Sequence, residues 1–205
     1  LFRSKDWQYY LQLTLTDEDA IKFVAETIGT NYRVLDRSNR GRKTEYRLQI
    51  HGKNYIEQVE RYGLVQRKSK IIPGVVLLNK EVKFLSYLIR AAIDGDGWVR
   101  KDGREFYIST ASEQFANWLQ KAMTDLGFAK IKVTSEIQSP GGKKITMYYV
   151  RTARAENIKL LKDIVYNKPY GMERKYNRVH GLNSCKTFRD YNKNTLIGKV
   201  NEVVG

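Results

Sequence analysis

The sequence repeats one order of secondary-structure patterns, and this duplication constrains the fold more than any other feature. Alternation and helical periodicity predict a strand, a helix, two strands and a helix in each half. In the first half these are residues 7–15, 16–28, 31–37, 43–50 and 53–61. In the second half they are residues 104–110, 112–126, 130–138, 143–151 and 155–166. The sequence therefore predicts two halves that share one arrangement of elements.

One segment between the halves breaks the symmetry. Residues 80–94 form a helical pattern with apolar residues at Val82, Leu85, Leu88, Ile89 and Ile93. The pattern ends in Gly95-Asp-Gly-Trp-Val, where glycines stop a helix at low steric cost. If the halves are equivalent, we expect a matching helix upstream of Leu1, ending in a similar Gly-(Asp/Glu)-Gly turn.

Composition narrows the class of partner. The 205 residues include 37 Lys and Arg against 22 Asp and Glu, a net charge of +15, and such a surplus most often binds phosphate. The 41% hydrophobic content excludes a disordered basic tail, and no stretch approaches the roughly 18 apolar residues that cross a bilayer. A single cysteine, Cys185, excludes an intramolecular disulfide and zinc sites built on paired cysteines. We expect a folded, soluble protein of the intracellular type; a ribosome-bound or membrane-surface protein would share this charge.

The segment Ile89-Arg-Ala-Ala-Ile-Asp-Gly-Asp-Gly97 resembles the nine-residue signature of the LAGLIDADG homing endonucleases. The match is strong over Ile93–Gly97 and looser before it, where Ala91 replaces the usual glycine. The repeated order of elements is also similar to this family, so the resemblance extends over residues 1–179 and leaves out 180–205.

The resemblance implies an α+β fold of two pseudo-symmetric αββαββα halves, each with an antiparallel sheet, which together form a DNA-binding saddle. The expected domains are residues 1–79, without the motif helix; residues 80–179, with the motif helix at 80–97; and a C-terminal extension over 180–205. In this family the two motif helices pack closely at the domain interface, and Ala91 and Ala92 are the small residues that would allow this.

The resemblance also implies a metal-dependent active site. By motif position Asp96 is the metal-binding acid, and the Gly95 carbonyl is a plausible extra ligand. Mg²⁺ or another hard divalent cation suits such oxygens together with phosphate. Asp94 is expected to order the helix end instead. The alternative for Asp96 is a simple helix-terminating turn.

The family also places a basic residue near the scissile phosphate in each half. By motif position these residues are Lys175 in the second half and Arg67 in the first, or Lys68 if the register slips by one. An exposed surface cation is the alternative for Arg67.

The strands are expected to supply the DNA contacts, because alternation gives each strand one buried row and one exposed row. Arg, Lys and Gln suit base edges and phosphates; a solvated face is the alternative for any single residue. The candidate DNA contacts are Arg33, Arg37, Lys43, Arg47, Gln49, Arg100, Arg104, Lys130, Lys132 and Lys144.

These observations favour a monomeric, intron-encoded homing endonuclease that cuts both strands of a long asymmetric DNA target with Mg²⁺. The alternative is a binding protein of the same fold, such as an intron RNA maturase or an inactive, for example ribosome-associated, relative. A basic structural protein would leave the duplication unexplained. No membrane partner is expected, and the sequence does not indicate a compartment.

Overall fold

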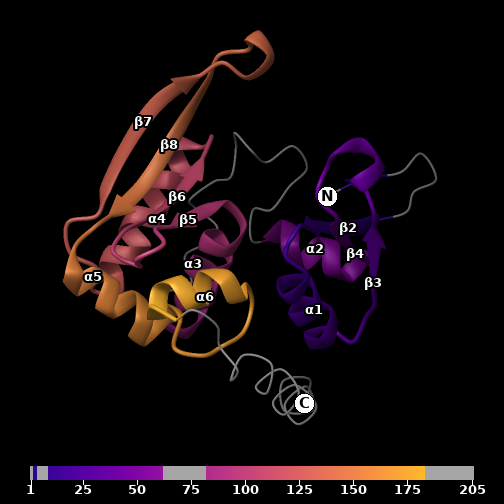
Figure 1. The fold of residues 1–205 in the computed structure, drawn as a ribbon, viewed down its shortest axis with the longest axis horizontal. Helices are drawn as coiled ribbons and strands as arrows, with labels where there is room; N and C mark the ends of the chain where they lie inside the picture. The colour runs from indigo at the N-terminus through magenta and orange to yellow at the C-terminus, as the bar shows by residue number, and fades with distance from the viewer. Residues whose placement is uncertain (1, 4–8, 62–81, 183–205) are drawn as a thin grey trace. The chain divides into compact units, whose positions relative to one another are not determined.

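The fold alternates short helices with antiparallel strands (Figure 1). The computed structural model describes residues 2–3, 9–61 and 82–182. Its strands are β1 (Phe2–Arg3), β2 (Tyr9–Leu15), β3 (Tyr32–Leu35), β4 (Glu45–His51), β5 (Gly97–Val99), β6 (Phe106–Thr110), β7 (Lys132–Gln138) and β8 (Ile145–Thr152). Its helices are α1 (Glu18–Thr27), α2 (Lys53–Arg61), α3 (Val82–Asp96), α4 (Glu113–Asp125), α5 (Ala155–Leu160) and α6 (Glu173–His180), with short turns η1 (Ser38–Arg40), η3 (Pro140–Gly142) and η4 (Leu161–Val165).

Two four-stranded sheets confirm the predicted α+β class and the duplication. Sheet A has the order β1-β2-β4-β3 and sheet B has the order β5-β6-β8-β7, and every neighbouring pair is antiparallel. In both sheets a helix follows the second strand and another follows the fourth, so the two halves have the same topology. Among the described helices, none is long and apolar enough to cross a membrane.

In the first half, α1 covers one face of sheet A. The core consists of Ile21 and Ala25 from the helix and Leu48 from β4, all at most 2% exposed. Tyr32 and Tyr46 pack against this core and contact each other edge to face. Acidic side chains occupy the first turn of α1, where the helix dipole favours them.

In the second half, α3 and α4 contact the same face of sheet B. Phe106, Ile108 and Val150 alternate inward along β6 and β8 and are at most 1% exposed. Ser112 caps α4 by accepting a hydrogen bond from the Phe115 backbone at 3.2 Å. Beyond this core the β7–β8 hairpin continues as an arm, with Ile137 70% exposed.

Some boundaries differ from the sequence prediction. Helix α3 continues through Gly95 and ends at Asp96, because a single glycine weakens a helix without stopping it. The expected helix over 155–166 changes to a wider π turn at Leu161–Val165. Residues 170–178 carry an unpredicted turn and helix, α6, after Gly171, whose φ of 74° suits glycine.

Contacts divide the described chain into two units. The first unit takes the residues up to Ile56, together with Lys168–Asn177 and Leu182; the second takes Glu57–Asn167 and Arg178–Gly181. The domain boundaries expected from the sequence, at residues 79 and 179, stay a prediction.

Hydrogen bonds explain why residues 168–177 join the first unit. The Arg174 guanidinium donates to Asp17 at 2.5 Å, and the Glu173 backbone N–H donates to the Asp19 carboxylate. Burial raises the pKa of Asp19, and the bond from Glu173 partly opposes this rise. The beginning of α6 is thus tied to the beginning of α1.

A buried asparagine ties α5 to sheet B. The Asn157 amide donates to the Ala129 carbonyl at 2.7 Å and to the Thr152 hydroxyl at 2.8 Å, and its oxygen accepts from the Ala129 N–H at 2.8 Å. The residue is 1% exposed. These three bonds hold the loop before β7 against the helix after β8.

We expect Asn157→Ala to lower the free energy of unfolding by about 2–3 kcal/mol, because buried partners lose their hydrogen bonds. Asn117→Ala, on the exposed side of α4, is the matched control and is expected to stay within about 0.5 kcal/mol of wild type. Urea denaturation measures both. Equal stabilities of the two variants would contradict the role of Asn157.

Candidate motif helix and nucleic-acid interface

Helix α3 has one buried side and one open side. Leu85, Ile89 and Ile93 are at most 3% exposed and hold the helix on sheet B. Ala91 and Gly95, on the other side, are exposed, and Ala92 is half-buried. Near the C-terminal end of α3, this side therefore carries only small residues. The predicted close approach of a second helix would require such residues. The described residues do not include that second helix.

Asp96 ends α3 with an exposed carboxylate. Its backbone carbonyl accepts a hydrogen bond from the Ser109 hydroxyl of β6 at 2.8 Å, which fixes the end of the helix on the sheet. For its carboxylate, the described part of the chain provides no hydrogen-bond or ion-pair partner. The side chain is therefore held in place by its backbone and left open to an external ligand.

Asp94, two residues earlier, has a different environment. It accepts a hydrogen bond from the Tyr166 hydroxyl at 2.6 Å, and its other oxygen lies 3.8 Å from the Arg90 guanidinium. Arg90 is 2% exposed, lies 4.4 Å from the centre of the Tyr166 ring, and donates to the Val165 carbonyl at 3.3 Å. Asp94 thus orders the helix end, as the sequence predicted.

The oxygens at the end of α3 fit a hard cation that is shared with a phosphate. No group of three His, Cys, Asp or Glu side chains gathers at metal-binding distance within residues 9–61 and 82–182. Mg²⁺ does not require such a cage, since one or two carboxylates with water and substrate phosphates commonly hold it. Asp96 supplies a carboxylate, and the last carbonyls of a helix, including that of Gly95, lack partners within the helix.

The two predicted basic residues differ in position. Lys175 lies on α6 in the first contact unit and is 2% exposed, so its ammonium is enclosed by protein. Arg67 and its alternative Lys68 lie outside the described residues.

The open face of sheet A brings two predicted arginines together. Arg33 of β3 lies directly opposite Arg47 of β4, and cross-strand partners share a face. Next to them Gln49 donates to Gln12 at 3.3 Å. Like charges directly opposite each other destabilise a sheet, so this face is suited to an anion. Arg37 instead pairs with Glu45 at 3.1 Å, and Lys43 is exposed before β4.

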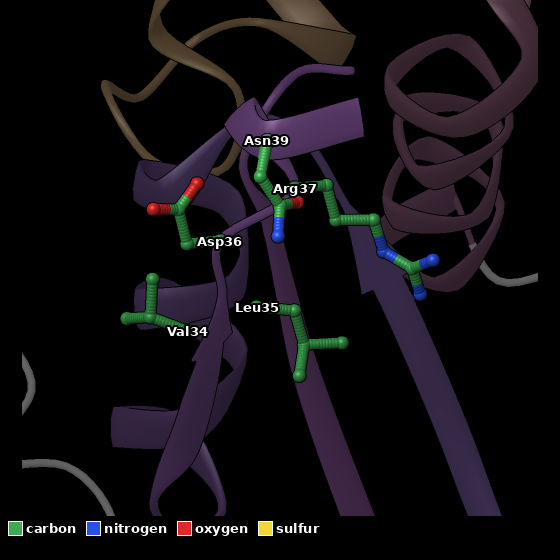
Figure 2. A pocket seen from close by; sticks show the side chains of 5 residues that line it. All are labelled: Val34, Leu35, Asp36, Arg37 and Asn39. Carbon is green, nitrogen blue, oxygen red and sulfur yellow. The ribbon is translucent and has the colours of Figure 1, made fainter. Parts of the chain in front are cut away.

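A cavity of about 340 Å³ at the end of β3 is lined by Val34, Leu35, Asp36, Arg37 and Asn39. Figure 2 shows the Arg37 guanidinium pointing away from the Asp36 carboxylate. The Ser38 backbone N–H donates to Asp36 at 2.8 Å and holds the pKa of that carboxyl below its usual value. Arg37 already pairs with Glu45, and Asp36 accepts from the Ser38 backbone. The charged groups of this cavity therefore stabilise the turn after β3.

The open face of sheet B carries a row of aromatic side chains. Trp98 of β5 stacks on Tyr107 of β6 with ring centres 5.3 Å apart, and Tyr107 contacts Tyr149 of β8 edge to face at 5.4 Å. Lys132 lies opposite Arg151 on the same face. The strand register shows that Trp98, Tyr107 and Tyr149 share the exposed face.

The remaining predicted DNA contacts lie at the ends of strands. Arg100 pairs with Asp102 at 3.2 Å in the β5–β6 loop. Lys130 precedes β7 with a φ of 50°, and Lys144 is exposed at the turn before β8. Arg104 leaves the sheet face altogether and lines a pocket with residues of α5.

Residues 83–166 match the sequence family described as the LAGLIDADG-like domain. Two curated relatives are much longer proteins. The ATP-dependent DNA helicase Hel308 of Thermococcus kodakarensis is 27% identical over 183 residues, which is 85% of this chain and 16% of the helicase. The DNA-directed RNA polymerase subunit Rpo1C of Methanocaldococcus jannaschii is 25% identical over 134 residues, 64% of this chain and 15% of that subunit. The chain thus spans about one sixth of the length of these relatives.

Two solved structures also resemble the chain. I-DmoI in complex with DNA and Mn has a TM-score of 0.46 and 14% identity, covering 80% of this chain and 86% of that chain. An I-DmoI variant in complex with its target DNA in the presence of Mn has a TM-score of 0.45 and 15% identity, covering 80% and 83%.

We expect Gly97→Ala to destabilise the protein by about 1–3 kcal/mol, the usual cost of overpacking. A Cβ at Gly97 would lie 2.6 Å from the Ile93 backbone, whereas a Cβ at Gly95 would meet nothing within 4 Å. Gly95→Ala is therefore the control, and it is expected to leave stability unchanged or raise it slightly. Thermal denaturation compares them, and equal losses in both would contradict this packing.

The hydrogen bond from Tyr149 to Glu136, 2.5 Å long, raises the pKa of Tyr149 to about 12. Glu136→Gln removes the negative charge that disfavours phenolate, so we expect the pKa of Tyr149 to fall toward 10. An NMR titration that follows the ring of Tyr149 alone measures this change, because a bulk ultraviolet titration would sum all 14 tyrosines. Glu18→Gln is the control, because Glu18 raises the pKa of Tyr32 to about 12 instead. A Glu136→Gln titration that superimposes on wild type would exclude the bond.

Proposed function

Because residues 83–166 match the LAGLIDADG-like domain family, we propose that the chain is a site-specific DNA endonuclease of the homing type. The observation that carries this proposal is the contrast between two neighbouring acids of the motif. Asp94 is taken up by Tyr166 and Arg90, whereas Asp96 presents an exposed carboxylate from the same anchored helix end. Such a carboxylate is suited to binding a metal ion together with a phosphate.

The proposed reaction is hydrolysis of a phosphodiester. Water attacks phosphorus, the bond to the leaving oxygen breaks, and that oxygen takes a proton. A bound Mg²⁺ or similar cation would neutralise the charge that develops on the phosphate oxygens. In this proposal Asp96, with the Gly95 carbonyl, holds the cation, and the Ser109 bond fixes the position of both. Cleavage of the second strand requires an equivalent acid at the other scissile phosphate.

Lys175 is proposed as a basic residue that supports phosphate charge in the second half, with Arg67 in the first. For Lys175 the support is its position in the motif, since its deep burial leaves little of the side chain to solvent. A role at phosphate would therefore need DNA to reach the enclosed ammonium.

The open sheet faces support duplex DNA as the partner and suggest asymmetric recognition. Sheet A presents hydrogen-bonding side chains, including Gln12, Arg47 and Gln49, which suit adenine and guanine edges. Sheet B presents Trp98, Tyr107 and Tyr149, which suit apolar contact with bases and sugars. Because one chain carries two different faces, a monomer could read a long asymmetric site.

The two curated relatives support an activity that resides in the segment they share with this chain, independent of the rest of each relative. One is named as a helicase and the other as a polymerase subunit, and the chain corresponds to only 16% and 15% of them. A segment shared by proteins with such different functions is expected to act independently of both. We therefore propose neither helicase nor polymerase activity for the chain.

A second candidate, binding of structured RNA without cleavage, is favoured by the aromatic row of sheet B. RNA recognition commonly stacks unpaired bases on exposed aromatic side chains. Trp98, which is 38% exposed, offers such a surface. Tight RNA binding with no DNA cleavage would support this candidate and replace the nuclease proposal.

We expect Asp96→Asn to reduce DNA cleavage by about 10²–10³-fold, because the metal ligand is weakened, while duplex binding stays within a few-fold. Cleavage is measured on a randomised target library with and without Mg²⁺. Asp125→Asn, which changes an acid on the exposed side of α4, is the control and is expected to cut normally. Undiminished cutting by Asp96→Asn would refute the catalytic assignment.

A further inference from the structure

A basic pocket lies beside sheet B, apart from the motif helix. It has a volume of about 340 Å³ and is lined by Arg104, Ala153, Ala155, Ile158, Lys159 and Lys162. Arg104 comes from the β5–β6 loop, while Lys159 and Lys162 come from α5 and η4. Among the described residues, the lining holds three cations and no carboxylate, and the other lining residues are apolar.

The pocket does not belong to the open face of sheet B. Asn157 of α5 bonds to Thr152, and Thr152 lies opposite Phe106, which is fully buried. Cross-strand partners share a face, so α5 covers the inner face of the sheet. Trp98 and Tyr107 lie on the other face. A ligand in the basic pocket would therefore be separate from a duplex held on the open face.

Three of the neighbouring acids already have other partners, and a fourth, Asp163, is exposed and is not among the residues that line the pocket. Glu105 pairs with Arg151, and Glu156 pairs with Arg154 at 2.7 Å. Asp102 pairs with Arg100. Over residues 9–61 and 82–182, the structure gives Arg104, Lys159 and Lys162 no ion-pair partner.

Clustered positive charge makes this arrangement slightly unfavourable without a ligand; the effect is small because Arg104 and Lys159 are exposed and solvent screens their charges. Lys159 and Lys162 are three positions apart on one helical segment, where side chains become neighbours and like charges repel. Lys162 is also half-buried, so solvent screens its charge less than that of an exposed lysine. An anion would turn this repulsion into attraction.

The chemistry of the lining identifies the class of anion. A guanidinium fork and two ammonium groups together match the several oxygens of a phosphate. The volume is at the lower end of the range for small-ligand pockets, and Ala153, Ala155 and Ile158 provide an apolar wall for the group that carries the phosphate.

We propose that the basic pocket binds a phosphate group, either from nucleic-acid backbone beyond the segment held by the open sheet faces or from a free phosphorylated molecule. The first source rests on the proposed DNA binding, and the second does not. A chain that fails to bind DNA would thus still test the pocket.

The experiment uses the full chain with Arg104→Gln, Lys159→Gln and Lys162→Gln combined. The control combines Lys22→Gln, Lys101→Gln and Lys121→Gln, which removes the same charge from exposed positions. The first probe is inorganic pyrophosphate, whose binding is measured by the amide NMR shifts of Ala153 and Ala155 and by thermal denaturation. The second probe is a random-sequence DNA duplex, whose affinity is measured at several salt concentrations.

If the source is a free phosphorylated molecule, pyrophosphate shifts the two amides and raises the melting temperature of wild type and control but not of the pocket variant. If the source is the nucleic-acid backbone, the slope of log affinity against log salt concentration becomes less steep in the pocket variant, by about 0.9 for each lost phosphate contact. This change exceeds the change in the control. Either result supports the pocket. Identical pyrophosphate responses together with identical salt dependences in the two variants would overturn it.

Discussion

The end of the motif helix depends on a buried polar cluster formed by Arg90, Asp94 and Tyr166. A guanidinium enclosed by protein is costly unless a carboxylate, a carbonyl or an aromatic ring compensates its charge, and here all three lie close to it. The cluster joins α3 to the end of the α5–η4 segment, so the position of the helix terminus is set by residues more than 70 positions away. The geometry of Asp96 depends on this join.

The same cluster explains how two acids two residues apart acquire different roles. Asp94 points toward the interior of its unit and accepts the Tyr166 hydroxyl, so its charge is used within the protein. Asp96 is the last residue of α3, and among the described residues the fold holds it through its backbone carbonyl, which accepts from Ser109. The protein thereby fixes the position of the second carboxylate while leaving its oxygens available.

The order of elements could be predicted from the sequence because each half alternates clear two-residue and helical periods. The sequence could not predict the sheet order, the helix α6, or the grouping of residues 168–177 with the first contact unit. These features depend on contacts between distant residues, such as Arg174 with Asp17. Among the candidate site residues, the metal-binding role of Asp96 stays a prediction, while the motif correctly indicated that Asp94 orders the helix end. Sequence alternation placed Arg33 and Arg47 on one face, but it could not show that they lie directly opposite each other.

Contacts that depend on loops were the hardest to foresee. Arg104 follows a strand-like pattern, yet the turn at Gly103, where an added Cβ would lie 2.4 Å from the Arg178 carbonyl, leads the chain onto the inner side of the sheet. Ser109 and Tyr166 carry no motif at all. The two acids of the motif give a sequence signal, whereas the hydroxyls of Ser109 and Tyr166, which bond to them, do not.

The arm formed by the β7–β8 hairpin has a consequence for recognition. Within the described part of the chain, no hydrophobic core lies behind its outer part. Side-chain hydrogen bonds among Glu136, Gln138 and Tyr149 support its pairing. A segment with few buried apolar contacts opens at a lower free energy than the sheet to which it is attached. The arm can therefore adjust its curvature to a bound surface without disturbing the core, at the cost of ordering entropy that is lost during binding.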